Sequence, residues 1–254
     1  IGLGAAVFVG NAWGSYRIAA RLQDPPLMVD RSLPKLRDIE KMPQVASVNM
    51  MITDFWSRLW ANAFLLHRAQ YFPTHTYEGR FNTALKGDWD LLGGLISVRL
   101  PSEGDSLSIE KPYSLVRVSS PYFLRAKLGD GWYDSERLSR NNQHWRWTKG
   151  DAELVVENPH PRPLHVAFRF QVRSLVERDL EVRVNGKRLR RGRIGTDLAW
   201  VKVPTITLPP GTTIVKLTSS LPAQPASATD RRLLGFAAYG IELDVKPAPD
   251  PADN

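Results

Sequence analysis

The stretch LHVAFRFQV, residues 164–172, places an apolar side chain at every second position. This period of two is typical of a β-strand that buries one face. After Gly129, further short stretches alternate in the same way and are separated by turn residues: 144–147, 152–157, 180–184, 200–203, 213–217 and 240–245. The pattern predicts an antiparallel β-sandwich of about seven or eight strands.

Two turn signals divide these strands. Asn185-Gly186 is the dipeptide of a two-residue hairpin, and Pro209-Pro210-Gly211 predicts another turn before the strand that follows. The residues after Val245 are rich in Pro, Ala and Asp and predict a frayed end. We therefore expect a β-sandwich domain at 121–246 and a disordered tail at 247–254.

The residues before the sandwich have a different pattern. Helical spacing of Leu33, Leu36 and Ile39 predicts a surface helix within 30–42, and Asp54 can cap a second helix from Phe55 to about residue 67. The stretches 45–52, 69–73 and 113–118 are rich in strand-forming residues. This order predicts a small α/β layer domain with a parallel sheet core at 23–120, and hence an α+β chain of two domains.

The most aromatic part of the first domain is WSRLWANAFLLHRAQYFPTHTYEGR, residues 56–80. Its first part predicts a covered helix with a wide apolar surface around Trp56 and Trp60, so these aromatic residues mainly build a core. Such a surface also allows an alternative function, in which the chain is a structural interaction module that docks on its own membrane portion. Only residues 74–80 stay open as a ligand site.

The first 13 residues, IGLGAAVFVGNAW, are apolar and uncharged, and Trp13 and Tyr16 precede Arg17 and Arg21. This order is expected where a transmembrane helix leaves the bilayer. Thirteen residues cannot span, since a crossing helix needs about 20. We interpret residues 1–22 as the end of a truncated transmembrane helix with its connector; a buried core segment and a signal-peptide remnant are the alternatives.

Composition limits the possible functions. The chain has 254 residues and no Cys, which excludes disulfides, thiolate metal sites and a Cys nucleophile. The formal net charge of +8 comes largely from the second half, where six bases fall within residues 183–193. Such a run is able to meet phosphate, nucleic acid or lipid headgroups, but a solvated hairpin explains it more simply. No nucleic-acid partner is predicted.

Three motifs point to a family: GWYDSE at 131–136, WRW at 145–147 and DRRLLGF at 230–236. They resemble the β-sandwich modules at the extracytoplasmic C-termini of bacterial cell-envelope glycosyltransferases and related polytopic membrane proteins. The segment DFWSRLWANAFLL at 54–66 is similar to the preceding α/β part of such proteins, so the resemblance covers about residues 30–245. It implies a membrane-anchored, extracytoplasmic (periplasmic) setting, a multi-spanning domain upstream, and a sandwich of jelly-roll or carbohydrate-binding-module-like kind.

The resemblance carries no catalytic residue to this chain. In membrane glycosyltransferases of this kind the catalytic acid lies in the membrane portion, so an enzyme activity of the full-length protein would belong there. We expect this chain to bind or position a glycan or lipid-linked sugar for polysaccharide assembly.

Sugar binding needs aromatic faces with polar groups beside them. Residues 132–147 supply both, and we expect Trp132, Tyr133, Glu136 and Arg146 to contact a glycan. Trp145 and Trp147 share one strand face and are expected in a core, and Arg146 is an alternative buried partner for Glu136. In the first domain Tyr77, Glu78 and Arg80 follow a strand that Pro73 ends, where α/β domains bind ligands, so they face either a ligand or the sandwich.

A free-standing glycan hydrolase is the second alternative. Hydrolysis needs two carboxylates at a defined separation, and Glu78 with Asp88 or Asp90 is the candidate pair. Asp54 is better explained as a helix cap. His67 and His75 do not have metal-ligand spacing, and no nucleotide loop or nucleophile elbow occurs, so no metal or cofactor is predicted.

Overall fold

The structure is a computed structural model that describes residues 41–52, 68–71, 86–108, 113–138 and 143–247, and also Leu36, Ile39, Arg58, Ala61 and Leu65. The expected transmembrane end at 1–22, the body of both predicted helices and the tail from 248 lie outside the described residues. Within the described part of the chain no helix has the length and apolar character to cross a bilayer.

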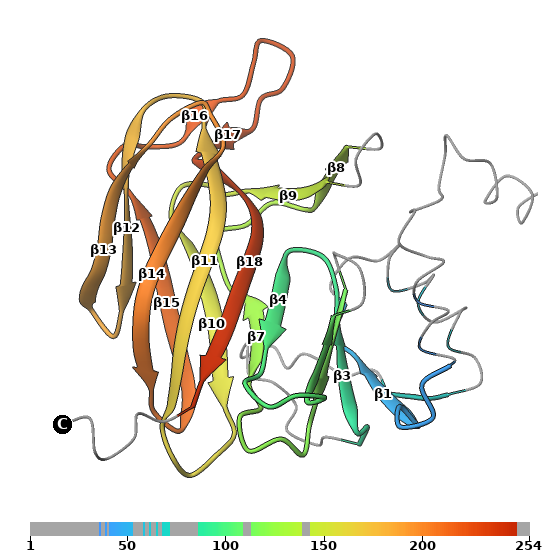
Figure 1. Ribbon diagram of the computed structural model, residues 1–254. Coiled ribbons are helices and arrows are strands. Elements are labelled where there is room, and N and C mark those ends of the chain that lie inside the picture. Colours follow the sequence, from blue (N-terminus) through green and yellow to red (C-terminus); the bar gives the residue numbers. More distant parts are fainter. Residues whose placement is uncertain are drawn as a thin grey trace, which may run out of the picture.

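The second half of the chain is a β-sandwich of two sheets, as predicted (Figure 1). One sheet has the order β13-β12-β15-β10-β7, with antiparallel neighbours throughout. Its strands are β7 (Arg125–Leu128), β10 (Ala152–Asn158), β12 (Arg178–Val184), β13 (Lys187–Ile194) and β15 (Gly211–Ser219).

The other sheet has the order β14-β11-β18-β9-β8, also antiparallel, and its strands β14, β11 and β18 lie in front in Figure 1. Its strands are β8 (Glu136–Leu138), β9 (Gln143–Trp147), β11 (Leu164–Ser174), β14 (Ala199–Leu208) and β18 (Phe236–Lys246). A two-stranded ribbon, β16 (Gln224–Pro225) with β17 (Leu233–Leu234), lies at one end of the sandwich.

Strict alternation explains why these segments form strands with one buried face. On β11 the apolar residues Val166, Phe168, Phe170 and Val172 are all at most 4% exposed, and they pack against the apolar face of the other sheet. The Asn185-Gly186 turn joins β12 to β13, with φ of 48° and 79°, so the predicted hairpin is confirmed.

The first half of the chain contributes a mixed sheet with the order β2-β1-β3-β6-β5. β1 pairs in parallel with β2 and β3, whereas β6 pairs in antiparallel fashion with β3 and β5. The strands are β1 (Ser47–Met50), β2 (Ala69–Tyr71), β3 (Trp89–Leu92), β5 (Ser106–Ser108) and β6 (Ser114–Arg117). Strand is the main regular structure of the described residues, so they do not support the small α/β layer domain. The predicted parallel core is present at β2-β1-β3, but β6, which was expected to close the same unit, is antiparallel.

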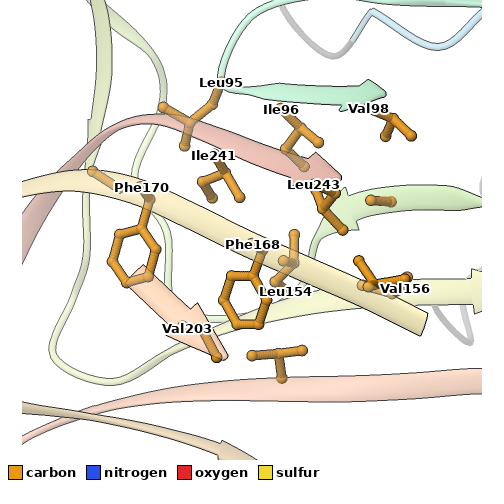
Figure 2. Close-up of a cluster of buried hydrophobic side chains, with 14 of the residues drawn as sticks. Leu95, Ile96, Val98, Leu154, Val156, Phe168, Phe170, Val203, Ile241 and Leu243 are labelled. Carbon is orange, nitrogen blue, oxygen red and sulfur yellow. The ribbon is translucent and has the colours of Figure 1, made fainter. Parts of the chain in front are cut away.

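One strand from the first half belongs to the sandwich. β4 (Ile96–Arg99) pairs in parallel with β18, with Ile96 opposite Ile241 and Val98 opposite Leu243. Figure 2 shows Ile96 and Val98 beside these partners, above Phe168 of β11. The two halves therefore share a sheet and a hydrophobic core across residue 120.

Candidate functional site

The carboxylate pair of the hydrolase hypothesis does not form a catalytic arrangement. Asp90 is 1% exposed, and both of its oxygens are occupied. Arg125 donates from Nε to Oδ2 (2.7 Å) and from Nη2 to Oδ1 (2.9 Å), and Asn49 donates from Nδ2 to Oδ1 (2.7 Å). A carboxylate held in this way connects the first sheet to strand β7 of the sandwich, which is a structural role.

Asp88 has fewer hydrogen-bond partners in the described residues than Asp90. It is exposed, and its Oδ2 accepts a hydrogen bond from the Ser47 hydroxyl at 2.6 Å. Its proposed partner Glu78 lies outside the described residues, as do Tyr77 and Arg80. Among the residues that the structure describes, no group of three or more His, Asp or Glu side chains is placed to hold a metal ion.

The Asp90–Arg125 pair has two further charged neighbours on the outer face of its sheet. Glu157 lies opposite Arg125 in the β7–β10 register. Lys127 is two residues after Arg125 on β7 and lies on the same face of the strand. Burial raises the pKa of the Glu157 carboxyl and lowers the pKa of the Lys127 ammonium, with each group opposing the shift of the other. These groups form a buried charge cluster between the two halves of the chain.

Trp132 is not a surface residue. It is 8% exposed, its Nε1 donates to the carbonyl oxygen of Glu153 at 2.8 Å, and its ring meets Phe236 edge-on with centroids 6.4 Å apart. Gly131, with φ of +88°, turns the chain so that Trp132 enters the main core. The predicted surface position of Trp132 is therefore wrong.

Tyr133, Glu136 and Arg146 lie close together. Glu136 Oε2 accepts from Trp145 Nε1 at 3.1 Å, and its Oε1 accepts from Arg232 Nη1 at 2.6 Å. Arg146 Nη1 donates to the backbone oxygen of Tyr133 at 3.4 Å. The cation that pairs with Glu136 thus comes from the distant DRRLLGF motif, a partner that sequence spacing alone could not indicate.

Tyr133, Trp145, Trp147 and Tyr239 pack together, and we call them the aromatic cluster. Their rings are largely covered. Trp145 stacks on Tyr239 with centroids 5.5 Å apart, and the core role expected for Trp147 agrees with its 5% exposure. Lys149 and Arg232 lie over the Tyr133 ring at 5.4 and 5.5 Å. The Tyr133 hydroxyl donates to the Leu233 carbonyl. Because these groups bind one another, the aromatic cluster mainly attaches the β16–β17 ribbon to β9 and β18.

A different surface is open to solvent. The outward-facing residues of β14, β11, β18 and β4 form a continuous sheet face, which we call the open face. It carries one large exposed aromatic side chain, Trp200, with charged and amide groups around it. Its members are Ser97, Arg99, His165, Arg169, Gln171, Trp200, Lys202, Thr207, Glu242, Asp244 and Lys246.

Trp200 is 44% exposed and lies opposite Gln171 in the β11–β14 register. The Arg169 guanidinium lies 4.8 Å from the centroid of its ring and makes two hydrogen bonds, of 2.8 and 2.7 Å, to Glu242 Oε2. This cation–π and ion-pair chain holds the indole at a defined place on the sheet. The sequence signal for Trp200 was available, because its neighbours Val201 and Val203 face inward and alternation sends Trp200 outward.

The basic run at 183–193 lies on the opposite sheet, where acidic residues pair with part of it. Glu181 pairs with Arg183 at 2.7 Å and with Arg188 at 3.4 Å, and Asp179 pairs with Arg191 at 2.6 Å. The Arg191 hydrogen bond lowers the pKa of Asp179. This is the ladder of a solvated hairpin, in agreement with the simpler interpretation.

Comparisons with known proteins do not assign a family. The sequence matches no protein-family model and no curated protein. Solved structures with some similarity include a GH26-CBM35 β-(1,4)-mannanase from Podospora anserina, with 9% identity, a TM-score of 0.33, and coverage of 50% of this chain and 29% of the mannanase.

A family 35 carbohydrate-binding module from Clostridium thermocellum has 11% identity and a TM-score of 0.29, with coverage of 48% of this chain and 89% of the module. A Cry1Da tryptic core variant from Bacillus thuringiensis has 13% identity and a TM-score of 0.34, with coverage of 54% and 27%. At these values the similarity assigns no ligand to this chain, so its own residues have to indicate one.

Proposed function

We propose that this chain is a non-catalytic glycan-binding region, and that the open face is its sugar-binding surface. The observation that carries the proposal is the exposed Trp200 indole on a solvent-facing sheet, with Gln171, Lys202 and Thr207 on the same face. An aromatic ring binds the apolar face of a pyranose, and amide, hydroxyl and charged groups beside it bind the sugar hydroxyls. Because Arg169 fixes the indole before a ligand arrives, little side-chain entropy is lost on binding.

The wider setting belongs to the same proposal. We infer a membrane-anchored protein whose upstream membrane domain uses this extracytoplasmic region to hold a glycan or lipid-linked sugar during polysaccharide assembly. The apolar residues 1–13, with their aromatic and Arg flank, support the anchor, and the motif resemblance supports the envelope setting. The paired state of Asp90 gives no support to a hydrolase, and the ion pairs of Arg183, Arg188 and Arg191 favour a solvated hairpin over a nucleic-acid site.

Replacement of Trp200 by alanine tests the surface. We expect Trp200→Ala to weaken glycan binding about tenfold, since aromatic contacts contribute about 0.5–1.5 kcal/mol and 1.4 kcal/mol corresponds to a factor of ten. The free energy of unfolding should change by only about 0.5 kcal/mol, because the side chain is 44% exposed. Isothermal titration of the full chain with gluco-, manno-, xylo- and galacturono-oligosaccharides measures the first quantity, and urea unfolding measures the second.

A matched control is Ile214→Ala, which removes an equally exposed apolar side chain from the outer face of the opposite sheet. It should leave binding unchanged. Equal affinities of the wild type and Trp200→Ala for every glycan that binds would show that the open face is not the site. Absence of binding to all four classes would count against the glycan-binding function itself.

A further inference from the structure

The open face has an uneven charge. It carries four basic side chains, Arg99, Arg169, Lys202 and Lys246, and two carboxylates, Glu242 and Asp244. His165 adds a further titratable group. The surplus of positive charge is therefore located on the same surface as Trp200.

Both carboxylates of the open face are already paired. Glu242 accepts two hydrogen bonds from Arg169, and Asp244 pairs with Lys246. Lys202 and Arg99 are exposed, and within the described residues neither makes an ion pair. The Nε of Arg173 is buried and has no hydrogen-bond partner, while its guanidinium lies 5.5 Å from the Tyr239 ring. Two exposed cations thus remain available to a ligand.

The opposite sheet also carries basic side chains, and several of them are paired. There Arg183, Arg188 and Arg191 are paired with Glu181 or Asp179, and Lys216 is 3.5 Å from Glu153. Lys187 and Arg190 are exposed on that side and make no ion pair within the described residues. The open face differs because its exposed cations lie on the same surface as the exposed indole of Trp200.

The two available cations are far apart. Lys202 lies opposite Arg169, Arg169 lies opposite Glu242, and Glu242 lies opposite Ser97, two residues from Arg99. Three strand spacings and a shift of two residues separate them by about 15 Å. One small anion cannot contact both, but a chain with repeated anionic groups can.

We propose that the ligand of the open face is an anionic glycan, whose acidic groups meet Lys202 and Arg99 while one of its sugars packs on Trp200. This inference rests on the proposed glycan-binding function and adds the chemical class of the ligand. The shared chemistry is a negative charge on the sugar chain, supplied either by a uronate carboxylate or by a phosphate.

The first test compares acidic ligands with neutral counterparts of the same sugar. The full chain is titrated with oligogalacturonate and with the same oligomer as its methyl ester, and with a phosphorylated mannan oligosaccharide and its unphosphorylated form. We expect at least one of the two acidic ligands to bind about tenfold more tightly than its neutral counterpart in dilute buffer. The difference should shrink in 1 M salt, where the screening length falls to about 3 Å. Tighter binding of the phosphorylated ligand would identify phosphate as the charge, and tighter binding of the uronate would identify carboxylate.

The second test uses paired variants with the same change in charge. Lys202→Gln with Arg99→Gln should lose about tenfold in affinity for the acidic ligand and keep the affinity for its neutral counterpart. Lys216→Gln with Arg188→Gln removes two exposed charges from the opposite sheet and should change neither affinity. An equal loss in both double variants would overturn the proposal, because only the net charge would then matter.

Different results would overturn the anionic class of the ligand and the glycan-binding function itself. Equal binding of each acidic ligand and its neutral counterpart, with a loss on Trp200→Ala, would overturn the anionic class and leave glycan binding in place. No binding of any oligosaccharide would overturn both.

Discussion

Replacing Asp90 by alanine is expected to lower the free energy of unfolding by about 3–5 kcal/mol, because it removes the carboxylate that makes two hydrogen bonds with the buried Arg125 guanidinium. The two side chains are 1% and 3% exposed, and two hydrogen bonds of 2.7 and 2.9 Å join them. Asn49 loses its 2.7 Å acceptor in the same change. Urea unfolding of the full chain, followed by Trp fluorescence, measures the loss.

Two comparisons separate this effect from a general loss of surface charge. Asp179→Ala breaks an exposed ion pair of similar length, at 2.6 Å, and should cost far less. The double variant Asp90→Leu with Arg125→Met removes both charges and should be less destabilised than Asp90→Ala, because the Arg125 charge does not stay buried after its hydrogen-bonded carboxylate is lost. If Asp90→Ala were no more destabilising than Asp179→Ala, the pair would not hold the two halves together.

The sequence shows Asp90 and Arg125, but it does not show that they pair. Sequence patterns indicate Asp90 only as a catalytic candidate, because its neighbours in the chain are the only context that a pattern provides. Arg125 is 35 residues away, on strand β7 of the sandwich. An ion pair between two sheets leaves no periodic signal, so only the fold reveals it.

It was easier to predict which face of a strand is buried than to predict which sheet the strand joins. The alternation in 164–172 correctly indicated Phe168 and Phe170 as core residues. The stretch 96–99 also alternates, with Ile96 and Val98 buried, but it is only four residues long and follows Gly93-Gly94. Its partner β18 is more than 130 residues away, so its place in the sandwich could not be predicted from local sequence.

The Trp residues show where the period of two no longer predicts the direction of a side chain. Trp200 and Trp147 lie in regular strands, and their faces follow from the period of two. Trp132 follows a glycine in a positive-φ conformation, outside the named strands. At such a turn the direction of the side chain depends on the backbone, and the GWYDSE motif does not reveal it.

Gly131→Ala is the second substitution for which we expect a large effect, a loss of more than about 4 kcal/mol. Gly131 has φ of +88°, and an added Cβ would overlap the carbonyl oxygen of Asp151 and lie 2.8 Å from Ala152 Cα. Both obstacles are backbone atoms at the start of β10, so no side-chain rotation relieves the contact. Thermal and urea unfolding of the full chain measure the change.

Gly211→Ala is the matched control, because Gly211 has φ of +86° and no atom within 4 Å of an added Cβ. It should cost only the conformational strain, about 1–2 kcal/mol. The difference between the two variants therefore isolates the contact with β10. Around Gly131 that contact is tight because Lys149 N donates to Gly131 O at 2.8 Å and Trp132 Nε1 donates to Glu153 O at 2.8 Å. Equal losses in the two variants would mean that β10 can move away, and that Trp132 does not depend on this turn for its place in the core.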